Sequence, residues 1–87
     1  MNYQVFIRSA AQRSLATLPQ REYEAVRDAI LALSSETRPR GCKKLNSRDG
    51  WRIRLGKYRV IYRIDDSAHK VRGTHVVHRS DIYRGLN

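Results

Sequence analysis

Residues 51–64 constrain the fold of this chain most, because apolar and charged side chains alternate there on both sides of a glycine. The period of two over residues 51–55 predicts a half-buried strand. Gly56 and Lys57 follow, and a glycine in the first of two loop positions is typical of a type II′ turn. Residues 58–64 continue as a second strand, so the segment predicts an antiparallel β-hairpin.

The two-residue turn also decides which side chains lie opposite one another in that hairpin. It places Arg54 opposite Arg59, with Arg52 and Arg63 on the same face. The other face takes the apolar side chains, which are Trp51, Ile53, Leu55, Tyr58, Val60, Tyr62 and Ile64. Directly opposed like charges destabilise a sheet by up to about 1 kcal/mol, so the arrangement is unfavourable unless an anion binds there. Arginine donates to two phosphate oxygens at once, and we interpret this face as a phosphate clamp. The alternative is that the arginines extend into water and bind nothing.

Periodicity and turn residues predict the elements that precede the hairpin. Residues 3–7 alternate and predict a first strand. Ser9 and Gln12 have capping-box spacing, so a helix is expected to begin at Ser9. Pro19 ends that helix and suits the first position of a second one, in which apolar residues recur at helical spacing over residues 23–33. The two helices are expected to form an antiparallel pair.

The remaining residues complete a small sheet. Residues 34–50 are polar and carry glycine and proline, which predicts a loop. Residues 65–69 predict a turn and residues 71–77 a last strand, and residues 80–87 have room for a helical turn only. We therefore expect a single α+β domain over residues 1–87, of the order β-α-α-β-β-β, with two N-terminal helices packed on one face of a small antiparallel sheet.

Nearly all of the net charge of +10 comes from the middle of the chain. Residues 38–63 hold ten lysines and arginines against Asp49 alone, which gives +9, whereas residues 1–37 sum to zero. A field this concentrated predicts a polyanionic partner, with RNA or DNA ahead of anionic lipid. A merely soluble basic surface would spread the charge along the whole chain. The further basic side chains expected to contact RNA or a ribosome are Arg40, Lys43, Lys44, Arg48, Lys57 and Arg63.

The cysteine and histidine content limits the kinds of site that the chain can form. Cys42 has no partner for an intrachain disulfide, and a reducing, cytoplasmic location is expected. No apolar run approaches the ~20 residues of a membrane helix, and the first residues do not resemble a signal peptide. No histidine has a carboxylate at metal spacing, so neither a metal nor another cofactor is expected. His69 is expected to be solvated in a turn and His75 to be partly buried. Only His78, beside Arg79, is a candidate for proton chemistry near neutral pH.

Two motifs resemble those of a family of bacterial toxins. Residues 50–64, which contain the hairpin, resemble the central signature of the RelE toxins of the RelE/ParE superfamily. Residues 78–84 resemble the closing motif of the family, and the resemblance spans nearly the whole chain. It implies a microbial-RNase-like α+β fold and a ribosome-dependent endoribonuclease that cuts mRNA in the decoding site. It also implies an acidic antitoxin encoded beside the toxin, with which the toxin would form a hetero-oligomer.

The resemblance carries roles for particular residues. The positions that match functional residues of the family are Arg52, Arg54, Arg59, Arg79 and Tyr83. The first three would bind the phosphate and stabilise its developing charge, Arg79 would neutralise the leaving 5′ oxygen, and Tyr83 would orient a base. In well-studied members the basic pair is lysine, and one lysine is proposed as the general base. Arg54 stays protonated at ordinary pH, which leaves the base unassigned, with His78 as the best local candidate.

The expected function is metal-independent cleavage of ribosome-bound mRNA. A ribose 2′-OH would attack the adjacent phosphate, and naked RNA would be cut weakly because the ribosome supplies the reactive geometry. Two other classes stay open. A ParE-like toxin of the same fold would inhibit DNA gyrase without cutting RNA, and a non-catalytic basic module would only bind nucleic acid. The converging arginines favour the nuclease, because binding to gyrase does not require a cationic face.

Overall fold

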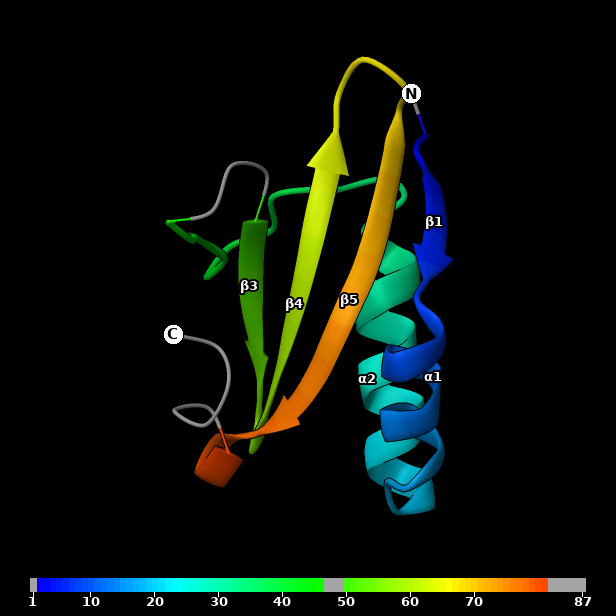
Figure 1. The fold of residues 1–87 in the computed structure, drawn as a ribbon, viewed down its shortest axis with the longest axis vertical. Helices are drawn as coiled ribbons and strands as arrows, with labels where there is room; N and C mark the ends of the chain where they lie inside the picture. Colours follow the sequence, from blue (N-terminus) through cyan, green and yellow to red (C-terminus); the bar gives the residue numbers. More distant parts are fainter. Residues whose placement is uncertain (1, 47–49, 82–87) are drawn as a thin grey trace.

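The chain folds into a layer of helices packed on a layer of strands. The computed structural model describes residues 2–46 and 50–81. The sheet has five strands, and both helices lie behind one of its faces (Figure 1). The helices are α1 (Ser9–Ala16) and α2 (Gln20–Ala32). The strands are β1 (Gln4–Ile7), β2 (Lys43–Lys44), β3 (Gly50–Leu55), β4 (Tyr58–Asp65) and β5 (Lys70–His78), and the 3₁₀ turn η1 (Arg79–Asp81) follows. Their order in the sheet is β1-β5-β4-β3-β2. The α+β class and the succession of the predicted elements are confirmed.

The hairpin of β3 and β4 has the register that its turn predicts. Arg54 pairs with Arg59, and Arg52 pairs with Ile61. Gly56 has a φ of +62°, as the first loop position of a type II′ turn requires. The arginines and the apolar residues therefore lie on opposite faces of the hairpin.

The expectation of a wholly antiparallel sheet is wrong in one pairing. β1 runs parallel to β5, with Val5 opposite Val71. Alternation predicts which face of a strand is buried but carries no information on the direction of its neighbour. The connection from β1 to β5 passes through both helices and three strands, so no tight turn forces the two to run antiparallel. The predicted loop before the hairpin also contains the short strand β2, which pairs with β3.

The first helix begins at Ser9 as predicted but has a different N-cap, and the second helix begins one residue later than predicted. The N-cap of α1 is Arg8, where the backbone is still extended, and Ser9 is its first helical residue. The capping box is not formed, because the side-chain amide of Gln12 donates to the carbonyl of Ile7 (2.9 Å). Pro19 is the N-cap of α2 and not its first residue. In the described part of the chain, neither helix has the length and apolar content needed to span a membrane.

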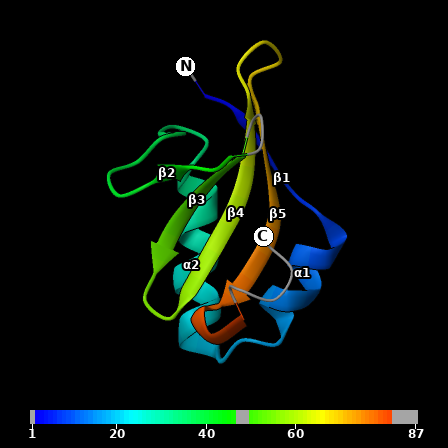
Figure 2. The ribbon, with the colours of Figure 1, turned by 60° about the vertical axis from the view of Figure 1, so that its left-hand side comes forward.

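The core lies between the helices and the sheet. Its largest fully buried side chains are Tyr62, Ile30, Leu33, Val26, Val60 and Val71. The hydroxyl of Tyr62 donates to the carbonyl of Thr37 (2.9 Å), so the polar end of the largest of them has a partner in the loop after α2. Because α1 and α2 share one face of the sheet, they leave the arginine-bearing face uncovered (Figure 2).

Candidate nucleic-acid interface

Cations lie opposite one another across three strand pairs of the helix-free face. Arg54 is opposite Arg59, Arg52 of β3 is opposite Lys43 of β2, and Arg63 of β4 is opposite Arg72 of β5. We call this surface the cationic face; its members are Lys43, Arg52, Arg54, Arg59, Arg63 and Arg72. Like charges that lie opposite one another in a sheet repel, and an anion bound between them would relieve the repulsion.

The clamp residues Arg52, Arg54 and Arg59 are coupled electrostatically. Burial of the Arg52 guanidinium, followed by the positive charges of Arg59 and Arg54, lowers the pKa of Arg52 below its ordinary value. Arg52 is half-buried, whereas Arg54 is exposed. The positive charges of Arg54 and Arg59 therefore act on Arg52, and all three side chains lie on one face of the hairpin.

A β-bulge in β5 decides which histidine lies on the cationic face. Between the partners of Ile61 and Tyr62, β5 contains one extra residue, Thr74. Because of this residue, His75 lies on the cationic face, while His78 lies on the helix-covered side. His75 is half-buried, as expected, and its Nδ1 is 3.0 Å from the hydroxyl of Thr74.

The structure does not bring His78 together with the arginines. Its ring packs edge-on against Tyr58, with 5.3 Å between the two ring centroids. Tyr58 in turn interacts with α2, because a hydrogen bond to the carboxylate of Glu22 raises the pKa of Tyr58. The backbone N–H of Ser80 donates to Nδ1 of His78 (3.1 Å), and the hydroxyl of Ser80 lies 2.8 Å from the same nitrogen. Ser80 therefore occupies one of the two ring nitrogens of His78.

Arg79 lies at the end of the sheet that carries the clamp. It is exposed, and its backbone N–H donates to the carbonyl of Lys57 in the hairpin turn (2.7 Å). Arg54 and Arg59 are the second pair from that turn. The hairpin turn thus holds Arg79 close to the clamp along the backbone.

The other predicted contact residues are more scattered. Lys44 points to the helix side, where its ammonium lies over the Trp51 ring at 5.5 Å from the centroid. Arg40 is exposed in the loop after α2, and Lys57 is exposed in the hairpin turn. Arg48 and Tyr83 lie outside the described residues. Among the members of this set that the structure describes, Lys43 and Arg63 join the clamp residues on one face.

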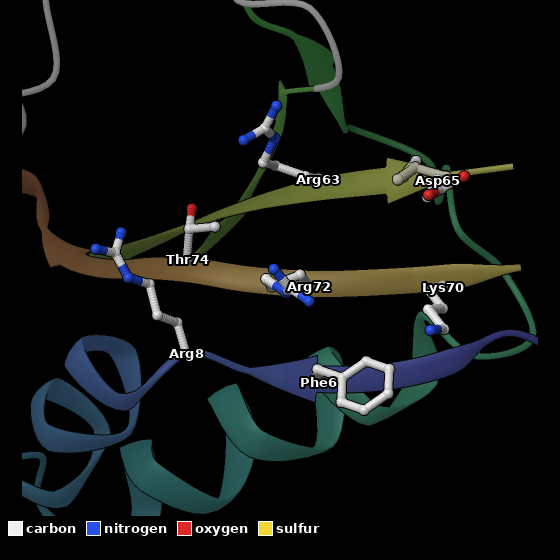
Figure 3. Close-up of a pocket in the computed structure, with 8 residues that line it drawn as sticks. Phe6, Arg8, Arg63, Asp65, Lys70, Arg72 and Thr74 are labelled. Carbon is white, nitrogen blue, oxygen red and sulfur yellow. The ribbon is translucent and has the colours of Figure 1, made fainter. Parts of the chain in front are cut away.

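The cationic face reaches further than the sequence predicts. Figure 3 shows Arg8, Arg63 and Arg72 on one side of the sheet, from the end of β1, from β4 and from β5. Alternation within β5 could have identified Arg72 as a member of this face. Arg8 reaches the same side of the sheet only because β1 pairs parallel with β5. Among residues 2–46 and 50–81, no group of three or more His, Cys, Asp or Glu side chains is placed to hold a metal ion.

Comparison with known proteins identifies the family. Residues 5–83 match the family model of the ParE toxin of the type II toxin–antitoxin system parDE. This chain is a toxin of the RelE/ParE superfamily. The toxin is also 34% identical over 84 residues to Toxin RelE of Mycobacterium tuberculosis (strain ATCC 25618 / H37Rv), which covers 94% of this chain and 87% of that relative. The family predicted from the hairpin and closing motifs is confirmed.

Solved structures of similar toxins share the fold. The toxin superimposes on a chain of the archaeal RelE-RelB complex from Pyrococcus horikoshii OT3 with a TM-score of 0.83 and 29% identity, covering 91% of the toxin and 97% of that chain. A chain of the toxin–antitoxin complex RelBE2 from Mycobacterium tuberculosis gives a TM-score of 0.79 and 35% identity, covering 91% and 100%. The RelE-type fold that the resemblance implies is thereby confirmed.

Proposed function

We propose that this toxin is an endoribonuclease that cuts mRNA on the ribosome without a metal ion. The observation that carries the proposal is the opposed pair Arg54 and Arg59, with Arg52 on the same face. Burial of Arg52, and after it the charges of Arg59 and Arg54, lower the pKa of Arg52. A fold needs no such arrangement for its stability, and a phosphate satisfies it. The 34% identity to a toxin named RelE supports the same interpretation.

The clamp would act on the phosphate and not on the protons. The 2′ oxygen of the ribose forms a bond to phosphorus as the bond from phosphorus to the 5′ oxygen breaks. This leaves a 2′,3′-cyclic phosphate and a 5′-OH, so that a proton is lost from the 2′ oxygen and gained by the 5′ oxygen. Arg52, Arg54 and Arg59 would stabilise the charge that develops on the phosphate oxygens, and Arg79 would neutralise the leaving 5′ oxygen.

No guanidinium of the clamp can accept the proton of the 2′-OH, because arginine stays protonated. His78, the candidate base from the sequence, faces the other side of the sheet from the clamp. We therefore assign removal of the 2′-OH proton to no described side chain of the toxin. The rate would then depend on the ribosome, which holds the mRNA with its 2′ oxygen aligned for attack. Naked RNA should therefore be largely spared. The role proposed for Tyr83, orienting a base, falls outside the described residues.

We further infer that an acidic antitoxin covers the toxin when the toxin is inactive. The similar chains from Pyrococcus horikoshii and Mycobacterium tuberculosis were both solved in toxin–antitoxin complexes. Without such a partner, a chain with a net charge of +10 would bind polyanions at once. A hetero-oligomer of toxin and antitoxin is the expected resting form.

The test is a translation reaction in which the 5′ ends of the mRNA are mapped. The wild type should create new 5′-OH ends in ribosome-bound mRNA and few in the same mRNA without ribosomes. Arg59→Gln should lower the cleavage rate by about 100-fold or more, because it removes a donor that stabilises the developing charge. Arg13→Gln is the matched control, since Arg13 is exposed on α1 and makes the same change of charge away from the face. Equal cleavage by wild type and Arg59→Gln would contradict the proposed role of the clamp.

A second function is favoured by one observation, which is that the matching family model describes the ParE toxin. The resemblance implies that a toxin of that kind inhibits DNA gyrase. The toxin prepared for the cleavage experiment can also be used to test this function. The measurement is supercoiling of a relaxed plasmid by gyrase in the presence of the toxin. Arrested supercoiling together with intact mRNA would replace the nuclease proposal.

A further inference from the structure

The cationic face continues beyond the clamp into a cavity at the β1 edge of the sheet. The cavity has a volume of about 410 Å³ and is lined from β1, β4 and β5 (Figure 3). Cavities that bind small ligands start at about 300 Å³, so one nucleotide-sized group fits the space. We call it the Arg72 pocket, after the residue opposite both Arg63 and Phe6.

The charge of the Arg72 pocket selects an anion. Four cations line it, namely Arg8, Arg63, Lys70 and Arg72. The backbone N–H of Arg8 donates to the carbonyl of Gly73 (2.8 Å), which fixes Arg8 beside β5. Among the described residues that line the pocket, the one acidic side chain is Asp65, and it accepts a hydrogen bond from the backbone N–H of Ala68 (3.0 Å). Guanidiniums from β4, from β5 and from the residue that follows β1 surround one cavity, and such a group is suited to phosphate oxygens.

The aromatic ring of Phe6 narrows the class of anion. Phe6 lies directly opposite Arg72 and is 40% exposed, on a face where its neighbours are charged. The ammonium of Lys70 lies 5.7 Å from the centroid of the ring. Nucleic-acid bases stack on exposed aromatic rings of sheet surfaces while arginines hold the backbone. An acidic peptide would use the cations of the pocket but has no need of the ring.

The Arg72 pocket is separate from the clamp. Arg59 and Arg63 are four residues apart on one face of β4, which is about 13 Å along the strand. One phosphate cannot bridge that distance with hydrogen bonds of about 3 Å. A phosphate in the pocket is therefore a different one from the phosphate held in the clamp.

We propose that the Arg72 pocket binds a nucleotide of single-stranded RNA that flanks the cleaved phosphate, with its phosphate on Arg8 and Arg72 and its base stacked on Phe6. The inference rests on the proposed function in that it takes RNA as the target. It adds a subsite that positions the strand at a distance from the reacting bond. Such a subsite would help to explain how a clamp without a general base holds its substrate in line.

The experiment measures binding of a short fluorescent single-stranded RNA to the full-length toxin by anisotropy, as a function of salt. Phe6→Leu should weaken binding about fivefold or more, because it removes the stacking surface, and should leave the salt dependence unchanged. Arg72→Gln should weaken binding and lower the slope of log affinity against log salt by about 0.7, the value for one phosphate of a single strand. Arg13→Gln on α1 is the charge-matched control and should bind nearly as the wild type does.

An abasic strand of the same length isolates the role of the base. Wild type and Phe6→Leu should bind the abasic strand equally, while Arg72→Gln should still bind it more weakly. Because Phe6 and Arg72 are both exposed, thermal melts of each variant should match the wild type. If Phe6→Leu does not fold, Arg72→Gln and the abasic strand together still test whether the pocket binds a nucleotide.

Several outcomes would overturn the proposal. One is wild-type affinity for RNA in both pocket variants, and another is a wild type that does not bind the oligonucleotide. A third is an oligo-glutamate peptide that loses its binding in Arg72→Gln while RNA binding is unaffected, which would assign the pocket to an acidic protein. The mapping of mRNA ends remains an independent measurement. Cleavage by a wild type whose pocket variants bind RNA normally would reject the pocket and retain the proposed function.

Discussion

At the scale of single residues, the toxin places like charges together where a stable sheet would avoid them. Arg54 faces Arg59 directly, and Arg52 is held near both with a lowered pKa. Side chains retained for binding often reduce the stability of the free protein. The clamp should therefore limit the stability of the domain, and under the proposed function the same side chains would bind the phosphate.

Replacing one arginine of the clamp should stabilise the toxin and disable it. In Arg54→Gln the repulsion from Arg59 is lost, so the free energy of unfolding should rise by a few tenths to about 1 kcal/mol. In a domain of this size that corresponds to a melting temperature a few degrees higher. Thermal unfolding at low salt measures the gain, with Arg13→Gln as the control that should not shift. A lower melting temperature for Arg54→Gln would show that the arginines do not repel one another as described.

Tyr62 is the residue on which the core depends most. It is completely buried, and its hydroxyl bonds to the carbonyl of Thr37. Tyr62→Phe removes only that bond and should destabilise the toxin by about 1 kcal/mol, whereas Tyr62→Ala should cost about 3–5 kcal/mol. Trp51→Ala should cost less than Tyr62→Ala, because Trp51 is only half-buried. Urea unfolding of the three variants gives the order, and a larger loss for Trp51→Ala would contradict it.

At the scale of elements, the sequence determines what is local and leaves open what is distant. The register of the hairpin could be predicted to the residue pair, because a two-residue turn and a period of two leave a single register. The direction of β1 could not, since its partner β5 lies at the other end of the chain. For the same reason the clamp was predicted and Arg8 was not. The bulge at Thr74, which decides that His75 and not His78 shares the face of Arg72, leaves no mark in the alternation.

One side chain joins three segments that are far apart in the sequence. Asp66, in the turn between β4 and β5, accepts hydrogen bonds from Arg38 of the loop after α2 (2.9 Å) and from the hydroxyl of Tyr3 (2.6 Å). The hydrogen bond from Arg38, followed by that from Tyr3, holds the pKa of Asp66 below its ordinary value. The carboxylate thus links the turn to the N-terminal strand and to the loop.

This link should make a small part of the stability depend on pH. Because the pKa of Asp66 is lower in the folded state, its contribution is complete above the unfolded pKa and is lost as the pH falls through the folded one. Asp66→Asn should therefore melt at a lower temperature than the wild type near neutral pH. The difference should close below about pH 4, where the carboxylate of the unfolded chain is protonated. Melting curves over this range measure it, and a gap that persists at the acid end would exclude Asp66 as its source.

At the scale of the whole molecule, the helices and the cationic face lie on opposite sides of one sheet. The helices cover one side (Figure 2), and the strand pairing places the members of the cationic face on the other. An approaching polyanion therefore meets a single broad surface. Association driven by such a surface is fast and sensitive to salt.

Binding of the antitoxin should remove that sensitivity. The affinity of the isolated toxin for ribosomes should fall steeply with salt, because each neutralised phosphate releases counterions. In the complex with the antitoxin, both the affinity and the slope should be much reduced, since an acidic partner would neutralise the cationic face. Ribosome co-sedimentation over a salt series, with and without the co-encoded neighbour, is the measurement. An unchanged slope in the complex would show that the antitoxin leaves this face free.

The parallel pairing of β1 with β5 also bears on when a newly made toxin becomes active. β1 is synthesised near the start of the chain, but its partner is the last strand, with Gln4 opposite Lys70. Contacts this distant form late, because closing a long loop costs entropy before the pairing compensates for it. While the ribosome still holds β5, neither the full sheet nor the Arg72 pocket can assemble. The complete sheet of each toxin molecule therefore assembles only once β5 has left the ribosome that made it.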